Sequence, residues 1–295
     1  MGLSKHELAA LTRLFSATVL RECGSLGRSP LFSRLMRQIS MLRDGDMEIS
    51  VGDAFDRAFS VLQQLGHRDE YVYRSAITQK LLLGRHSLRT AAVIHEMRAG
   101  SSKADVVVLN GTSTAYEIKS ERDSLARLPS QLASYRRVFA AVSVVTSPRR
   151  YREVLAGIPD DVGLLVLSDV YTIQVVKEAP VLPQRTSPLE ILQVLRSSEA
   201  TAILQGLGFK VPKVPNTQMH SELKTQFAKL DPIDAHDQMV RVLRTTRSQS
   251  NLAGYVESLP TSLRAAMLAA NMNQQGRERV QQALATRLGT ALAWS

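Results

Sequence analysis

The chain is poor in cysteine and aromatic residues, and it lacks long hydrophobic runs. Cys23 is the only cysteine among 295 residues, so the chain can form neither an internal disulfide nor a cysteine metal cluster. This scarcity is typical of a reducing compartment, and we expect a cytoplasmic protein. No uncharged apolar segment reaches the length of about 20 residues that a membrane helix needs, and the first residues lack the apolar core of a signal peptide. We therefore expect no membrane partner.

Acidic residues are outnumbered by basic ones. The 27 Asp and Glu residues face 37 Lys and Arg residues, which gives a net charge of +10 and a pI near 10.0. The content of 44% hydrophobic and 22% charged residues is ordinary for a globular protein, and the length allows two domains. The excess positive charge favours a polyanionic partner, although a merely soluble basic protein would show the same balance.

The pattern along the chain predicts three regions. Residues 1–66 read as an N-terminal helical region, which begins with a capping box of Ser4 and Glu7. Residues 67–180 alternate strands and helices. Prolines then mark a linker, and residues 187–295 form a C-terminal helical domain whose last helix we expect to end at Gly289. These C-terminal helices resemble a small DNA-binding module, and they equally resemble a module for dimerisation or docking of a protein partner.

Two apolar runs on either side of Asn110-Gly111 predict a β-hairpin, because both residues tolerate positive φ. We expect strands over residues 106–109 and 115–118. Side chains alternate across a strand, so Glu117 and Lys119 point to one face.

The hairpin turn decides where Asp105 points. A two-residue loop turns Asp105 away from Glu117, whereas a three-residue loop, which pairs Leu109 with Ser113, places Asp105 opposite Glu117. Two adjacent carboxylates require a cation between them, and a divalent metal would serve. Mg²⁺ accepts one or two carboxylates together with water and phosphate oxygens.

At these residues the chain resembles the PD-(D/E)XK nuclease superfamily. Its signature is an Asp at one strand and Glu-x-Lys on the next, which correspond here to Asp105 and Glu117-Ile118-Lys119, with Ala104 in place of the usual Pro. Gln131 and Tyr135 add a Gln-x-x-x-Tyr pair on one helix face, as in RecB-like members. The chain is thus similar to stand-alone bacterial nuclease-like proteins of this variant.

The resemblance implies an α/β (α+β) fold with a central mixed sheet flanked by helices, between the helical N- and C-terminal regions. The order strand, strand, strand, helix, strand would run from about residue 90 to residue 146. Further strands are expected at Gly163 to Ser168 and at Tyr171 to Lys177, the first of them buried on both faces because it is uniformly apolar.

The resemblance also implies a metal-dependent nuclease, a hydrolase that uses Mg²⁺ or Mn²⁺ on DNA rather than RNA, with defence against foreign DNA or phage as a setting. Asp105 and Glu117, with Glu96 as a further ligand, would hold the metal, and Lys119 would stabilise charge on the phosphate. Gln131 and Tyr135 would brace the site or hold the strand being cut.

Contacts to the nucleic acid are expected from three arginines that follow the motif. They are Arg122, Arg127 and Arg136. Two alternatives stay open. The chain is either a module on a nuclease-like fold that binds nucleic acid or protein without cutting, or a fold in which Glu117 and Lys119 form only a surface charge pair.

Overall fold

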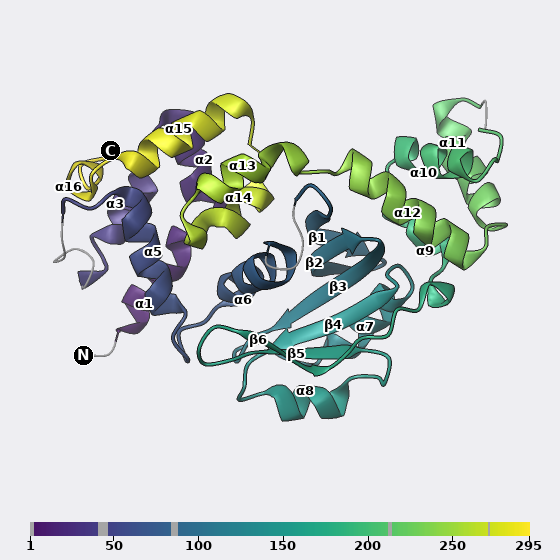
Figure 1. Cartoon of the computed structure of the whole chain (residues 1–295), viewed down its shortest axis with the longest axis horizontal. Helices are drawn as coiled ribbons and strands as arrows, with labels where there is room; N and C mark the ends of the chain where they lie inside the picture. The colour runs from purple at the N-terminus through teal and green to yellow at the C-terminus, as the bar shows by residue number, and fades with distance from the viewer. Residues whose placement is uncertain (1–2, 41–46, 84–87, 212–213, 271) are drawn as a thin grey trace. The chain divides into compact units, whose positions relative to one another are not determined.

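The chain divides into two compact units in a computed structural model, which describes residues 3–40, 47–83, 88–211, 214–270 and 272–295. One unit combines Met1–Leu81 with Leu252–Ser295, and the other is Leu82–Asn251 (Figure 1). This division differs from the three expected regions. The predicted C-terminal domain is shared between the two units, because only its last part packs with the N-terminal helices.

The first unit is helical. Its helices and short turns are α1 (Lys5–Leu14), α2 (Ala17–Leu26), α3 (Pro30–Met36), α5 (Val51–Leu62), α6 (Glu70–Ala76), α13 (Ala253–Ser258), η4 (Thr261–Leu263), α14 (Arg264–Ala270), α15 (Gln274–Ala285) and α16 (Leu288–Ala291). A π-helix, η1 (Ile77–Leu83), and a 3₁₀ turn, η3 (Ser250–Leu252), lie at its boundaries. The capping box of Ser4 and Glu7 is confirmed at the start of α1.

The two ends of the chain are joined by backbone hydrogen bonds within this unit. The N–H of Val51 donates to the carbonyl of Thr286 at 2.8 Å, and the N–H of Leu288 donates to the carbonyl of Ile49 at 2.8 Å. This bridge corrects one expectation. Gly289 does not end the preceding helix, since α15 stops at Ala285, where the extended Thr286 turns to pair with residue 51, and Gly289 lies within α16.

The second unit is built on a six-stranded mixed sheet (Figure 1). Its strands, in spatial order, are β1 (Ala92–Ala99), β2 (Ser102–Asn110), β3 (Thr112–Lys119), β4 (Ala141–Thr146), β5 (Gly163–Leu167) and β6 (Ile173–Lys177). The pairs β3–β4 and β4–β5 are parallel, and the other pairs are antiparallel. The expected α/β class with a mixed sheet flanked by helices is confirmed at this level.

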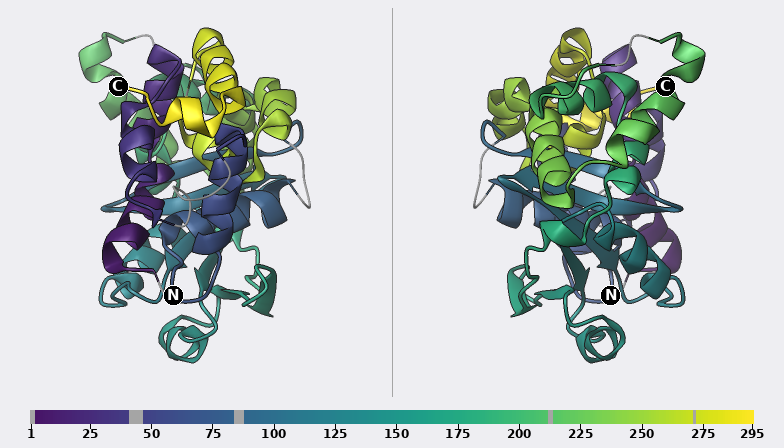
Figure 2. Two further views of the ribbon diagram at one scale, coloured as in Figure 1. Left: turned by 90° about the vertical axis from the view of Figure 1, so that its left-hand side faces the viewer. Right: turned by 90° about the vertical axis from the view of Figure 1, so that its right-hand side faces the viewer.

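Six α-helices and one short turn belong to the second unit among its described residues. They are α7 (Leu128–Arg136), α8 (Tyr151–Gly157), η2 (Pro183–Arg185), α9 (Pro188–Gln193), α10 (Ser197–Gly206), α11 (Asn216–Phe227) and α12 (Pro232–Thr246). One apolar core joins strands β1 to β5 to helices α7–α12. Helix α8 packs beside β5, far from β1 (Figures 1 and 2).

The expected strands are all found, although their ends differ by a few residues. All residues of β5 are buried, as its composition predicted. The last strand begins at Ile173 rather than at Tyr171, because Tyr171 adopts a positive φ of 57° in the preceding turn.

The hairpin adopts the longer of the two possible loops. Leu109 pairs with Ser113, and Asn110 pairs with Thr112, so that Gly111 alone forms the tip with a φ of +69°. This register continues toward Asp105 and Glu117, and it is the one that brings them opposite each other. No helix in the described parts of the chain is long and apolar enough to cross a membrane.

Candidate functional site

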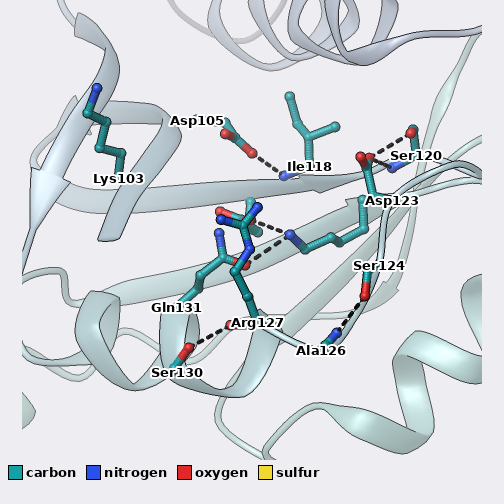
Figure 3. Close-up of polar contacts among 12 residues, drawn as sticks. Lys103, Asp105, Ile118, Ser120, Asp123, Ser124, Ala126, Arg127, Ser130 and Gln131 are labelled. Atoms are coloured by element: carbon teal, nitrogen blue, oxygen red, sulfur yellow. Dashed lines mark hydrogen bonds and ion pairs between the residues drawn. The ribbon is translucent and has the colours of Figure 1, made fainter. Parts of the chain in front are cut away.

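Asp105 is bound to the strand that carries the Glu-x-Lys motif. The regular pairing of β2 with β3 reaches Val106 and Tyr116. Beyond this pair, the Oδ2 atom of Asp105, the residue before Val106, accepts the backbone N–H of Ile118, two residues after Tyr116, at 2.6 Å (Figure 3). The carboxylate thus takes the place of a backbone acceptor where the two strands leave the ladder. Asp105 is half-buried at this point.

Lys119 links the β3 motif to helix α7. Its Nζ atom lies 2.7 Å from Oε1 of Glu117 and donates to Oε1 of Gln131 at 2.9 Å. Glu117 and Lys119 are 2% and 5% exposed, so this ion pair is shielded from water. Burying a charge is costly unless it is paired and hydrogen-bonded, and both conditions are met here.

Tyr135 occupies the other oxygen of Glu117. Its hydroxyl lies 2.7 Å from Oε2 of Glu117 and 2.5 Å from the backbone carbonyl of Lys103. Burial raises the pKa of Tyr135, and the negative charges of Glu117 and Asp105 raise it further. Tyr135 is therefore a neutral hydrogen-bond donor at physiological pH, and it braces Glu117 rather than exchanging protons.

Five of the predicted site residues converge from three elements. Asp105 comes from β2, Glu117 and Lys119 from β3, and Gln131 and Tyr135 from successive turns of α7. The helix begins with Pro129 in its first turn, which suits a residue without a backbone N–H. A spacing of four residues then places both α7 side chains on the face toward the sheet.

The sixth predicted residue, Glu96, does not join this buried group. Its side chain is 59% exposed and lies 3.7 Å from Nζ of Lys103, and its backbone has a positive φ of 51°. Within the described ranges, no group of three or more acidic, histidine or cysteine side chains is arranged to hold a metal.

A metal at this site would be held by two carboxylates. Asp105 and Glu117, completed by water and phosphate oxygens, are the kind of ligand set that Mg²⁺ uses. Each oxygen of Glu117 takes part in one contact, with Lys119 or Tyr135. An ionised carboxylate offers about four acceptor positions, so Glu117 keeps capacity for a cation.

The loop between β3 and α7 is fixed close to this group. The Oδ2 atom of Asp123 accepts from the N–H of Ser120 at 2.8 Å and from its hydroxyl at 2.6 Å. The Arg150 guanidinium donates to the carbonyl of Ser120 at 3.2 Å. Arg122 and Arg127 are exposed, and Figure 3 shows Arg127 extending toward the sheet beside Gln131.

Arg136, the third predicted nucleic-acid contact, is held by an ion pair at the other end of α7. Its Nε and terminal nitrogen lie 2.8 and 2.7 Å from Oδ2 of Asp161, which also binds Arg185. Burial alone would raise the pKa of Asp161, but the hydrogen bonds from both arginines outweigh it and lower that pKa. The contact holds α7 in place and occupies the guanidinium of Arg136.

The structure also joins Ser113, His236 and Asp237, a cluster that the sequence did not indicate. Nε2 of His236 lies 2.9 Å from the Ser113 hydroxyl, and its Nδ1 lies 2.9 Å from Oδ1 of Asp237. Ser113 is fully buried and accepts the N–H of Ala140 at 3.0 Å, so it is no nucleophile and instead ties α12 to the sheet. Desolvation lowers the pKa of His236, although Asp237 opposes this shift.

Comparison with known proteins places most of the chain in one family. A family model described as bacteriophage P4 protein cII matches residues 63–271. Protein cII of Enterobacteria phage P4 is 39% identical over 80 residues, which cover 26% of this chain and 30% of that relative. The alignment thus spans less than a third of the curated relative. No solved structure is significantly similar to the chain. Because the family model covers more than half of its length, the chain belongs to the bacteriophage P4 protein cII family.

Proposed function

We propose that the protein is a metal-dependent nuclease that hydrolyses phosphodiester bonds, in DNA rather than RNA, on a core of the PD-(D/E)XK type. The observation that carries this proposal is the contact of Lys119 with both Glu117 and Gln131, with Tyr135 on the second oxygen of Glu117. These are the residues of the Glu-x-Lys and Gln-x-x-x-Tyr motifs. The order β1, β2, β3, α7, β4 also agrees with that core.

The side chains would divide the work of hydrolysis. Asp105 and Glu117 would hold the metal, which when bound would lower the pKa of a water and neutralise charge on phosphate. Lys119 would place its positive charge at the phosphate as negative charge develops there. Tyr135 and Gln131 would keep Glu117 and Lys119 in position, and the exposed Arg122 and Arg127 would bind the flanking backbone.

The test is a cleavage assay with the full chain on linear DNA, circular DNA and RNA, with Mg²⁺, with Mn²⁺ and with chelator alone. We expect metal-dependent cleavage of DNA. Asp105→Asn should remove cleavage and, in calorimetric titration with Mn²⁺, metal binding. Glu96→Gln is the matched carboxylate control. It should retain both properties if two carboxylates suffice, whereas losing both would identify Glu96 as a third ligand.

A second candidate function is binding of nucleic acid or protein without cleavage. It is favoured by the burial of Glu117 and Lys119, because a satisfied and shielded ion pair also serves to fix a fold. Absence of cleavage with every metal and substrate, together with metal-independent binding of DNA, would support this candidate and contradict the nuclease. In either case we propose a cytoplasmic protein, and defence against foreign DNA is the setting in which we would first look for the activity.

A further inference from the structure

A pocket of about 740 Å³ lies in the second unit, away from the candidate site. It is formed by the hairpin tip at Gly111, the segment before β1 and the C-terminal half of α12. Gly111 and Lys119 lie at opposite ends of β3. Eight residues of extended strand separate them, which corresponds to about 26 Å. The pocket and the site therefore sit at opposite ends of the same strand.

The pocket is basic. Arg89, Arg241 and Arg244 line it, and among the lining residues that the structure describes Asp237 alone is acidic. Arg89 and Arg241 are exposed, and across the described residues no ion pair joins either of them to a carboxylate. Arg244 is anchored, because its guanidinium donates to the carbonyl of Thr90 at 2.8 Å.

Asp237 offsets only one of the three arginine charges. Its Oδ1 atom lies 2.9 Å from Nδ1 of His236 and is directed toward that ring. The remaining polar side chains of the lining carry hydroxyl groups, which can also donate a hydrogen bond to an anion. These are Thr90, Thr245, Ser248 and Ser250.

We propose that this pocket binds a phosphate group of a nucleic-acid backbone and anchors the nucleic acid independently of its sequence. Guanidinium groups suit phosphate because they donate parallel hydrogen bonds and stay charged at all physiological pH values. None of the described lining residues is aromatic, so these residues offer a base no ring to stack on. Phosphate contacts of this kind set position and affinity rather than sequence preference.

The position of the pocket sets its distance from the candidate site along a bound nucleic acid. A separation of about 26 Å along β3 corresponds to roughly seven or eight base pairs of a duplex, at about 3.4 Å per step. A duplex held at Arg89 and Arg241 would thus be contacted well away from Lys119. The pocket would contribute to binding alone, and it would hold the nucleic acid whether or not the candidate site cuts it.

The test measures binding of the full chain to a fluorescent 20-base-pair duplex by anisotropy, in chelator so that no cleavage occurs, over a range of salt concentrations. The pocket variant is Arg89→Gln with Arg241→Gln, which leaves the anchored Arg244 in place. The matched control is Arg28→Gln with Arg57→Gln, two exposed arginines of the first unit and the same change in charge. Circular dichroism verifies that both variants are folded.

We expect the pocket variant to bind at least tenfold more weakly at low salt. A plot of log affinity against log salt concentration has a negative slope, and for this variant the slope should be less negative by about two. The reason is that each lost phosphate contact means about one counterion fewer is released on binding. The control should keep the wild-type slope. A second duplex of unrelated sequence should give the same loss.

Several results would overturn the proposal. Equal losses in the pocket and control variants would mean that net charge alone is responsible. Unchanged binding in the pocket variant would exclude the anchor. Inorganic phosphate or a nucleoside triphosphate that binds wild type but not the pocket variant, while duplex binding is unaffected, would assign the pocket to a free anion. The duplex assay contains chelator, so no cleavage occurs in it, and failure of the hydrolysis proposal is recognised separately in the metal-dependent cleavage assay.

Discussion

Lys119 is buried, so its positive charge has to be stabilised by neighbouring polar groups instead of by water. The ammonium has Glu117 and Gln131 as partners, and its side chain is 7% exposed. Removing one partner of a buried ion pair costs about 3–5 kcal/mol, because the other charge stays buried without compensation. Lys119 and Glu117 thus form one unit, both for stability and for any chemistry at the site.

We predict that Lys119→Ala lowers the rate of cleavage at least about a hundredfold, since one preorganised electrostatic group contributes that much to a transition state. Lys119→Gln is measured beside it, because an amide still reaches Glu117 and protects the fold. Lys103→Ala is the matched control, as its side chain is 58% exposed. Cleavage rates are compared with urea unfolding of each variant.

Two outcomes would contradict this role. Wild-type rates in both Lys119 variants, with Asp105→Asn inactive, would mean that the lysine takes no part in the reaction. The second outcome is that only unfolded Lys119 variants lose activity, while every folded Lys119 variant keeps the full rate. Lys119 would then serve only to stabilise the fold.

At the scale of elements, Glu199 joins two helices of the second unit. It lies in the first turn of α10 and is 1% exposed. Its carboxylate accepts the N–H of Arg196 at 2.8 Å and binds Arg247, at the end of α12, at 2.9 and 2.7 Å. Burial alone would raise the pKa of Glu199, but the hydrogen bonds from Arg247 and from the backbone outweigh it and lower that pKa.

The sign of the resulting pH dependence follows from the lowered pKa. The carboxylate contributes its full stability above the usual glutamate value of 4.5, and this contribution is lost as the pH falls below 4.5 through the lower folded value. We predict that Glu199→Gln lowers the free energy of unfolding by about 1.5–3 kcal/mol at pH 7, the range for a hydrogen bond to a charged group.

Urea unfolding of this variant at pH 7 and near pH 3 provides the measurement. The difference in unfolding free energy between the variant and wild type should be smaller at the lower pH, because the stability that the lowered pKa provides is lost progressively as the pH falls below 4.5. Glu178→Gln, an exposed carboxylate of the same unit, should show little difference at either pH. A gap that stays constant with pH would show that Glu199 acts through packing and not through its charge.

At the scale of the whole molecule, the two ends of the chain build one helical unit. Helix α2 packs against α15, and the buried residues of the C-terminal part belong to the same unit as those of the first helices. They include Leu263, Met267, Val280 and Leu284. Each buried aliphatic side chain of this kind contributes roughly 1.5–3 kcal/mol.

We therefore predict that removal of residues 252–295 unfolds the N-terminal helices. Limited proteolysis followed by mass spectrometry should find new cleavage sites within residues 3–81 of the truncated chain and few within the sheet. The single substitution Leu284→Ala, with an expected cost of about 2–5 kcal/mol, serves as a milder form of the same test. Unchanged protection of residues 3–81 after truncation would show that they fold without the C-terminal part.

Local patterns determined much of the fold. The apolar runs beside Asn110-Gly111, the all-apolar β5 and the capping box at Ser4 each depend on neighbours within a few residues, and the structure agrees with all three. The spacing of Gln131 and Tyr135 also sufficed to place both on one helix face. Such features follow from backbone geometry and periodicity, which a sequence displays directly.

Tertiary structure alone decided the rest. Alternation allowed two hairpin registers, and only the packed sheet selects the pairing of Leu109 with Ser113 that brings Asp105 to the strand of Glu117. The surface position of Glu96, the joining of the chain ends and the meeting of Arg89 with Arg241 likewise depend on contacts between distant segments. Periodicity shows which face of an element is buried, but it does not show which element covers that face, because many partners bury the same apolar area equally well.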